Sequence, residues 1–172
     1  ILRCAYVGHR YHGFQIQPDV PTIQGEIGRA LEKLGYRRAI RYSSRTDARV
    51  SAIDQIIVLD SCDESLPMKL NEVLPRDIIM HSFAVLSKFS FREIRYKEYL
   101  YVAPNFQIDI SLTRRAIEYI NMGIRNYYYL IKKPSYLNSE DALMALRVNM
   151  TVSSDGIFFF VRGEKFYWEQ VR

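Results

Sequence analysis

Residues 40–59, IRYSSRTDARVSAIDQIIVL, read as two β-strands joined by a polar bend. Both ends of the stretch are rich in β-branched and aromatic side chains, which predicts strands over Ile40 to Tyr42 and Ile53 to Leu59. The bend holds Asp47, with an arginine two residues away on each side. A bend at a strand end can hold a functional side chain over a cleft, but an aspartate between arginines is also an ordinary surface turn. Composition alone favours the surface turn.

Helical periodicity marks three further segments. Apolar residues from Ile23 to Leu34 repeat at helical spacing after Pro21-Thr22, and Gly35 is expected to end that helix. The other two helices are predicted over Leu66 to Leu74 and over Ser111 to Met122, the latter with Ala116, Ile117 and Ile120 facing inward.

Strands are predicted between these helices, over Ile1 to Val7, Ile78 to Leu86, Ile94 to Val102, Leu143 to Val152 and Ile157 to Val161. The last two are separated by Ser153 to Gly156, which predicts a β-hairpin. Mixed helices and strands with hairpins favour an α+β fold, in which helices cover one face of an antiparallel sheet.

Composition is compatible with a globular protein that binds an anionic partner. The 172 residues suffice for one large or two small packed units, and 48% of them are hydrophobic. The net charge is +5 and the pI about 9.2, an excess that is also common in proteins that bind no polyanion. The distribution of charge says more, because one cluster of arginines predicts an RNA-facing patch: Arg37, Arg38, Arg41, Arg45 and Arg49.

The cysteines and histidines do not form a metal-ligand pattern. Cys4 and Cys62 lie far apart in apolar segments, so they are expected to be buried thiols of a protein from the reducing cytoplasm. The three histidines have no ligand spacing, and we expect no metal site. The sequence contains no apolar run long enough to cross a bilayer and no secretory leader. It begins without methionine, and we expect a fragment of a longer protein.

Several motifs resemble those of the TruA family of tRNA pseudouridine synthases. Arg45-Thr46-Asp47-Ala48, followed by Val50-Ser51-Ala52, is similar to the catalytic loop of that family. The other similar segments follow in the family's order: Tyr11 to Pro18 (YHGFQIQP), Leu70 to Ile78 (LNEVLPRDI), Lys97 to Tyr101 (KEYLY), and Gly163 to Arg172 with Phe166 and a final Gln-Val-Arg. The family usually has glycine where Ser44 and Arg49 stand and histidine where Ser51 stands, so the backbone of this loop is expected to be less free.

The resemblance implies a fold of two RRM-like (ferredoxin-like) halves that share a mostly antiparallel sheet, with helices on one face and a catalytic cleft between the halves. Residues 1–88 would form the half with the aspartate loop. Residues 89–172 would form the half with the tyrosine strand and a Val-Arg helix, truncated at its end. The implied activity is the isomerisation of uridine to pseudouridine in the anticodon stem-loop, at tRNA positions 38–40, by a cytoplasmic homodimer without a cofactor or a metal.

Residue roles follow from the same motifs. By resemblance, the catalytic residues are Asp47, Tyr99 and Arg172, with Arg172 paired to Asp47 and favouring its ionised form. Arg45 would fill the gap left by the flipped base, and the remaining RNA-binding residues would be Arg41, Arg49 and Lys97.

Two other functions also fit the residues. A catalytically silent RNA-binding module accounts for the arginines but gives no reason for Asp47 among them, because a carboxylate repels phosphate. An α+β domain that binds a protein partner rather than RNA could use Tyr167 and Trp168 as its anchor.

Overall fold

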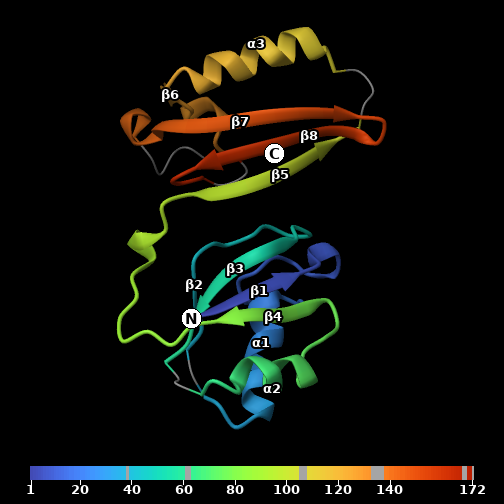
Figure 1. Cartoon of the computed structure of the whole chain (residues 1–172), viewed down its shortest axis with the longest axis vertical. Coiled ribbons are helices and arrows are strands. Elements are labelled where there is room, and N and C mark those ends of the chain that lie inside the picture. Colours follow the sequence, from blue (N-terminus) through green and yellow to red (C-terminus); the bar gives the residue numbers. More distant parts are fainter. Residues whose placement is uncertain (38, 61–62, 105–107, 133–137, 168–169, 172) are drawn as a thin grey trace. The chain divides into compact units, whose positions relative to one another are not determined.

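The computed structural model describes residues 1–37, 39–60, 63–104, 108–132, 138–167 and 170–171. The chain divides into two compact units, Ile1–Phe89 and Ser90–Arg172 (Figure 1). The described residues form three α-helices and two four-stranded antiparallel sheets, which confirms the α+β class. A sheet shared by the two halves and a catalytic cleft between them stay predictions. Each unit has a sheet of its own, because the strands of each sheet pair with one another inside that unit.

The first unit has the element order of a ferredoxin-like fold. Its elements are β1 (Leu2–Tyr6), α1 (Ile23–Lys33), β2 (Arg41–Tyr42), β3 (Ala52–Val58), α2 (Leu66–Val73) and β4 (Ile78–Phe83). The sheet order is β2-β3-β1-β4 and the pairs are antiparallel. This β-α-β-β-α-β order is that of an RRM-like unit, as the resemblance implied for this half.

The core of this unit lies between the sheet and its two helices. Alternation along β1 buries Leu2, Cys4 and Tyr6, and the helical spacing of α1 brings its apolar residues against them. The predicted ends of α1 are confirmed. The Thr22 hydroxyl accepts the Gly25 N–H at 3.2 Å as an N-cap, and Gly35 adopts a positive φ of 81° just beyond the helix.

Cys4 is fully buried in this core, and burial raises the pKa of its thiol to about 12. Because the thiolate is the reactive form, we expect Cys4 to resist iodoacetamide at pH 8 in the native protein and to react in urea. Mass spectrometry of the Cys4 peptide measures the labelling. Equal labelling in both conditions would show that this core is not packed as described.

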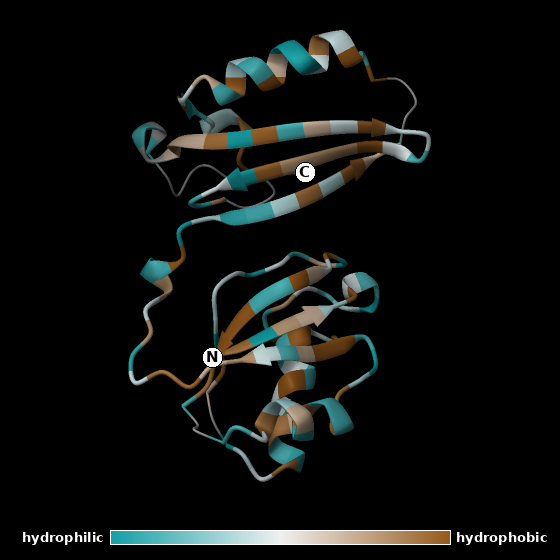
Figure 2. Cartoon of the chain, viewed as in Figure 1, coloured by the Kyte–Doolittle hydropathy of each residue, from teal (hydrophilic) through white to brown (hydrophobic). Residues whose placement is uncertain are grey.

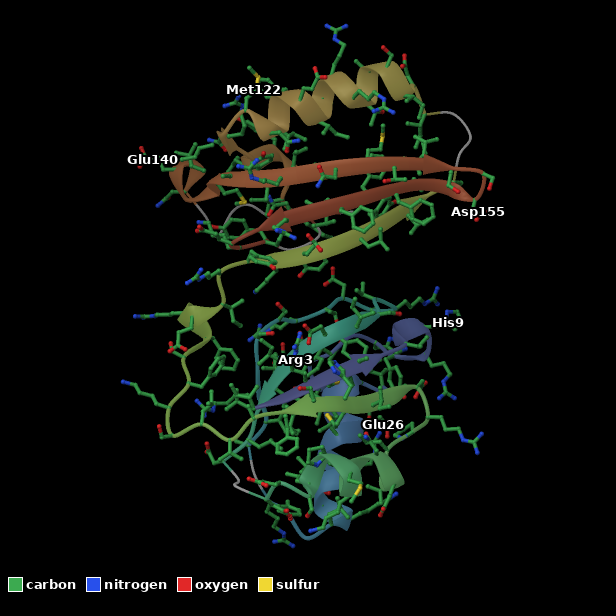
Figure 3. All side chains as sticks on the ribbon, in the orientation of Figure 1. Arg3, His9, Glu26, Met122, Glu140 and Asp155 are labelled. Atoms are coloured by element: carbon green, nitrogen blue, oxygen red, sulfur yellow. The ribbon has the colours of Figure 1, made fainter. Side chains whose placement is uncertain are left out.

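The second unit repeats part of the first. Its elements are β5 (Lys97–Ala103), α3 (Ile110–Asn121), β6 (Ile124–Asn126), β7 (Leu143–Ser153) and β8 (Gly156–Gly163). The sheet order is β5-β8-β7-β6, so β5, β8 and β7 are arranged like β1, β3 and β2 of the first unit. The predicted hairpin is confirmed: Ser153 pairs with Gly156, and Asp155 lies at its tip (Figure 3).

Three details of this unit differ from the sequence predictions. Strand β6 was not predicted, because three residues are too few to show a period. Figure 2 shows hydrophobic and hydrophilic residues alternating along α3, but of the three residues predicted to face inward, Ala116 is exposed, whereas Ile117 and Ile120 are half-buried. Phe166 and Tyr167, at the start of the predicted Val-Arg helix, are irregular, Gln170 bonds back to Tyr167 in a turn, and residues 168, 169 and 172 of that helix lie outside the described residues. No helix in the described parts of the chain is long and apolar enough to cross a membrane.

Candidate active site

The polar bend between β2 and β3 is held against the segment that follows β1. The Phe14 N–H donates to the Thr46 carbonyl at 3.0 Å, and the Arg49 N–H donates to the Tyr11 carbonyl at 3.0 Å. These two backbone hydrogen bonds lie on either side of Asp47. The motif around Tyr11 and the motif around Asp47, separated by more than thirty residues in the sequence, therefore form one structural element.

Two glycines allow this close approach. A Cβ on Gly8 would lie 2.0 Å from the Val50 carbonyl oxygen, and a Cβ on Gly13 would lie 2.8 Å from the Thr46 carbonyl oxygen. Gly13 also has a positive φ of 100°, which favours glycine on its own. The backbones of the two segments are thus in direct contact, with no room for a side chain between them.

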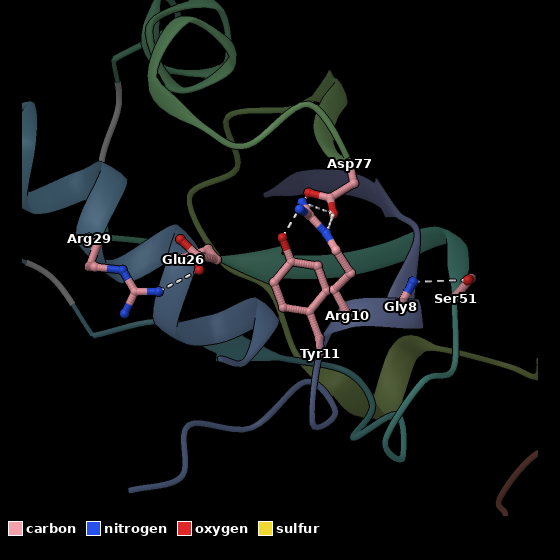
Figure 4. Close-up of polar contacts among 7 residues, drawn as sticks. All are labelled: Gly8, Arg10, Tyr11, Glu26, Arg29, Ser51 and Asp77. Carbon is pink, nitrogen blue, oxygen red and sulfur yellow. Dashed lines mark hydrogen bonds and ion pairs between the residues drawn. The ribbon is translucent and has the colours of Figure 1, made fainter. Parts of the chain in front are cut away.

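Side chains complete the attachment of the bend. The Gly8 N–H donates to the Ser51 Oγ at 3.0 Å (Figure 4), and the hydroxyls of Tyr6 and Thr46 share a hydrogen bond of 2.7 Å. At the start of the bend, the side-chain amide of the buried Gln55 donates to the Ser44 carbonyl. Four residues of the bend are therefore hydrogen-bonded to a neighbouring strand or loop: Ser44, Thr46, Arg49 and Ser51.

A third motif reaches the same place through Asp77, which directly precedes β4. Its carboxylate accepts the Tyr11 hydroxyl at 2.7 Å and the Arg10 Nη2 at 2.7 Å (Figure 4), and its carbonyl accepts the Val7 N–H at 2.9 Å. Burial raises the pKa of the Asp77 carboxyl, but the hydrogen bonds from Tyr11 and Arg10 outweigh it, and the pKa is below its usual range. Burial, followed by the bond to Asp77, raises the pKa of the Tyr11 phenol to about 12.

Asp47 itself stands half-buried in the bend, where its carbonyl accepts the Val50 N–H at 3.2 Å in a tight turn. Within the described residues of the first unit, no side chain forms an ion pair with its carboxylate. Arg45 and Arg49 are exposed on the same bend. Arg41 is also exposed but forms an ion pair of 3.2 Å with Asp60, which reduces the charge it offers to a ligand.

Arg49 adopts a left-handed backbone conformation, with φ at 66°. This is one of the two positions where the family pattern has glycine and this chain does not. At the other position, Ser44, the backbone has no positive φ. The expectation of a less free loop therefore applies at Arg49, where a non-glycine residue in this conformation costs about 1 kcal/mol.

We expect Arg49→Gly to be more stable than Arg49→Ala by about 1 kcal/mol, because both remove the guanidinium but only glycine relieves the backbone. Urea unfolding of the two variants measures the difference. The charge is lost in both, so electrostatic effects cancel. Equal stabilities would mean that the bend relaxes without cost when the side chain is alanine.

The remaining candidate residues belong to the second unit. Tyr99 is half-buried on β5 and packs edge-to-face on Phe166, with ring centroids 4.8 Å apart and an interplanar angle of 76°. Lys97 lies two residues away on the same face of β5, and burial lowers the pKa of its ammonium. Arg38, Trp168 and Arg172 lie outside the described residues, so the pairing of Arg172 with Asp47 stays a prediction.

The sequence reasoning missed Arg10, Tyr11 and Asp77 as a network, as well as the buried Gln55. Tyr11 and Asp77 lie in two of the motifs that resemble the family, whereas Arg10 and Gln55 lie in none, and no short-range pattern joins residues more than sixty positions apart. Gly8 and Gly13, on either side of Arg10 and Tyr11, were the sequence feature that could have indicated this contact. Glycine outside a hairpin often marks a place where two backbones approach closely. Among the residues that the structure describes, no three His, Cys, Asp or Glu side chains gather as a metal site.

Comparison with known proteins points to one family. The chain is 33% identical over 174 residues to tRNA pseudouridine synthase A of Archaeoglobus fulgidus and 30% identical over 177 residues to that of Pyrococcus horikoshii. Both matches cover 99% of this chain, and they cover 64% and 65% of the relatives. A shorter match, 45% identical over 103 residues, joins 58% of this chain to 40% of tRNA pseudouridine synthase A of Methanopyrus kandleri.

No family model matches the chain. The chain spans slightly less than two thirds of the length of the first two relatives, whereas nearly all of its own residues align with them. Matches of this extent, together with a ferredoxin-like first unit and a buttressed aspartate loop, agree with the family that the motifs suggested. The chain belongs to the TruA family of tRNA pseudouridine synthases.

Proposed function

We propose that this protein is a tRNA pseudouridine synthase that isomerises uridines of the anticodon stem-loop, with Asp47 as its catalytic residue. The relatives' printed name supports the general activity, since nearly the whole chain aligns with them. The observation that carries the assignment of Asp47 is structural. Its half-buried carboxylate stands on a bend that two backbone hydrogen bonds hold to the segment after β1, and the described part of its unit supplies no ion partner. An aspartate in an ordinary surface turn does not need backbone hydrogen bonds from the turn to a second segment.

The isomerisation of uridine needs a carboxylate and does not need a redox partner. Converting uridine to pseudouridine breaks the bond between C1′ and N1, turns the base, and forms a bond between C1′ and C5. The proton on C5 is lost and N1 gains one, so atoms and electrons balance without a cofactor. Asp47 could attack the sugar or the base, or remove the C2′ proton, and the proposal holds for each route.

A uridine in a stem or stacked loop must leave the helix before this reaction. We assign the aromatic wall for the extruded base to Tyr99, whose ring is fixed edge-to-face on Phe166. Arg45 would fill the gap in the RNA, and Arg172 would pair with Asp47. Arg41, Arg49 and Lys97 would contact phosphates. The resemblance further implies a homodimer, which analytical ultracentrifugation would measure.

The test is direct. The protein is incubated with unmodified tRNA transcripts, and pseudouridine is mapped by carbodiimide treatment and primer extension. We expect reverse-transcription stops in the anticodon stem-loop, at positions absent from a sample without enzyme. If tRNA binds but no uridine is converted, the silent RNA-binding module is the better description. If stops occur only outside the anticodon stem-loop, the activity stands and the substrate site is wrong.

The exposed arginines of the bend predict how binding depends on salt. We expect tRNA affinity to fall steeply as salt increases, because bound phosphates release counterions. Replacing Arg45 and Arg49 together by alanine should reduce the slope of log affinity against log salt by about two, if each contacts one phosphate. Filter binding across a salt series measures the slope. A slope equal to that of the unchanged protein would place the RNA path elsewhere.

A further inference from the structure

Asp77 joins the start of β4 to the segment at residues 7–11, which is more than sixty positions away in the sequence. Its carboxylate accepts hydrogen bonds from the Tyr11 hydroxyl at 2.7 Å and from Arg10 at 2.7 and 3.1 Å, and its carbonyl accepts the Val7 N–H. The Asp77 side chain is 17% exposed, whereas that of Arg10 is 69% exposed. The bond to Tyr11 is therefore the better shielded of the two side-chain contacts, and it is the one that a change in salt would affect less.

Tyr11 connects this carboxylate to the bend that carries Asp47. Its ring is packed in the core of the first unit and is 4% exposed, and its own carbonyl accepts the Arg49 N–H at 3.0 Å. The side chain of Tyr11 thus reaches Asp77 while its backbone holds the residue two positions after Asp47. A single residue separates the Asp77 carboxylate from the candidate catalytic bend.

We propose that Asp77 is a positioning residue, which fixes the bend at residues 46–50 through Tyr11 and thereby the place of the Asp47 carboxylate. This inference rests on the proposed function for its effect on the reaction, but not for its effect on the bend. Asp77 does not reach the substrate in this scheme. It acts through the backbone of Tyr11, which is why it is distinguished from a catalytic residue.

The ionisation of the network suits this role. The pKa of Asp77 is held below its usual range and that of Tyr11 is raised to about 12. At neutral pH the carboxylate accepts and the phenol donates, so the hydrogen bond is complete where the enzyme would work. A catalytic group displaced by about 1 Å can lose a hundredfold in rate, so a loose bend should cost turnover rather than binding.

The experiment compares Tyr11→Phe and Asp77→Asn with a matched control, Tyr36→Phe. Tyr36 also donates its hydroxyl to an aspartate, Asp63, which likewise accepts from a cation, Lys69, at 2.9 Å. The control deletes the same kind of bond in the same unit, and that bond does not involve the bend. Amide hydrogen exchange is followed by NMR at Arg49 and Phe14, whose N–H groups hold the bend, and at the amides of the β1 and β3 ladder.

We expect protection of the Arg49 and Phe14 amides to fall about tenfold relative to the sheet amides in Tyr11→Phe and Asp77→Asn, and to stay at the wild-type level in Tyr36→Phe. In parallel, the single-turnover rate should fall about tenfold or more, with tRNA affinity within about twofold of wild type. If Asp77→Asn does not fold, Tyr11→Phe, which removes one oxygen atom, decides alone.

Two results would overturn the inference. One is unchanged exchange at Arg49 and Phe14 in both variants. The other is a loss of protection that is equal in the bend and the sheet, because Asp77 would then stabilise the unit as a whole. A wild-type protein that makes no pseudouridine would refute the proposed function, and the exchange measurements would still show whether Asp77 holds the bend.

Discussion

Asp47→Asn is expected to abolish pseudouridine formation, by about three orders of magnitude or more, while tRNA affinity stays the same or becomes tighter. The substitution keeps the shape of the side chain but removes its charge, so the amide can neither attack carbon nor take a proton. In the unchanged protein the negative charge of Asp47 repels the phosphates of tRNA. Removing this charge should therefore not weaken tRNA binding. Single-turnover conversion and filter binding measure the two effects separately.

The control for this variant is Asp155→Asn. Asp155 is an exposed aspartate at the tip of the β7–β8 hairpin in the second unit, and the same change of charge there should leave conversion at the wild-type rate. A rate for Asp47→Asn within about tenfold of wild type would reject Asp47 as the catalytic residue. A loss of conversion accompanied by an equal loss of affinity would make Asp47 a binding residue instead.

Gly8→Ala is expected to destabilise the protein by about 3 kcal/mol, which is a large effect for the addition of one methyl group. The new Cβ would lie 2.0 Å from the Val50 oxygen and 2.4 Å from the Val50 carbonyl carbon. Both are backbone atoms, so no side-chain rotation can relieve the overlap. The bend at residues 46–50 must then move away from the segment after β1, and the hydrogen bond from the Gly8 N–H to Ser51 would be lost with it.

Gly28→Ala is the matched comparison. Gly28 lies inside α1, and apart from its chain neighbours and the nearby backbone of the helix itself, no heavy atom lies within 4 Å of a Cβ built there. Alanine is a better helix former than glycine, so this variant should be more stable than wild type by about 0.5 to 1 kcal/mol. Urea unfolding gives the free energy of unfolding of both variants, which can be compared directly if that free energy depends on urea concentration with the same slope in both. Similar stabilities for both would mean that the contact between Gly8 and Val50 is not as close as described.

Local patterns in the sequence were sufficient for most elements of secondary structure. Helix α1 could be placed from the spacing of its apolar residues, from Thr22 at its start and from Gly35 at its end, because capping and periodicity depend on neighbours within a few positions. The β7–β8 hairpin followed from two apolar runs and a Gly-containing turn. Where a local signal was weak, the structure differs: β6 was not predicted, and Ala116 on α3, predicted to face inward, is exposed.

The sequence by itself determined that the chain is α+β, where α1 and the hairpin lie, and that Asp47 stands on a bend between strands. Only the tertiary structure decided how that bend is held. Gly8 and Tyr11 contact it from the segment after β1, Gln55 contacts it from β3, and Asp77 holds Tyr11 from the start of β4. Such contacts depend on which faces pack and on which backbones approach. Propensity and periodicity describe only a residue's near neighbours, so they carry no information about these distances.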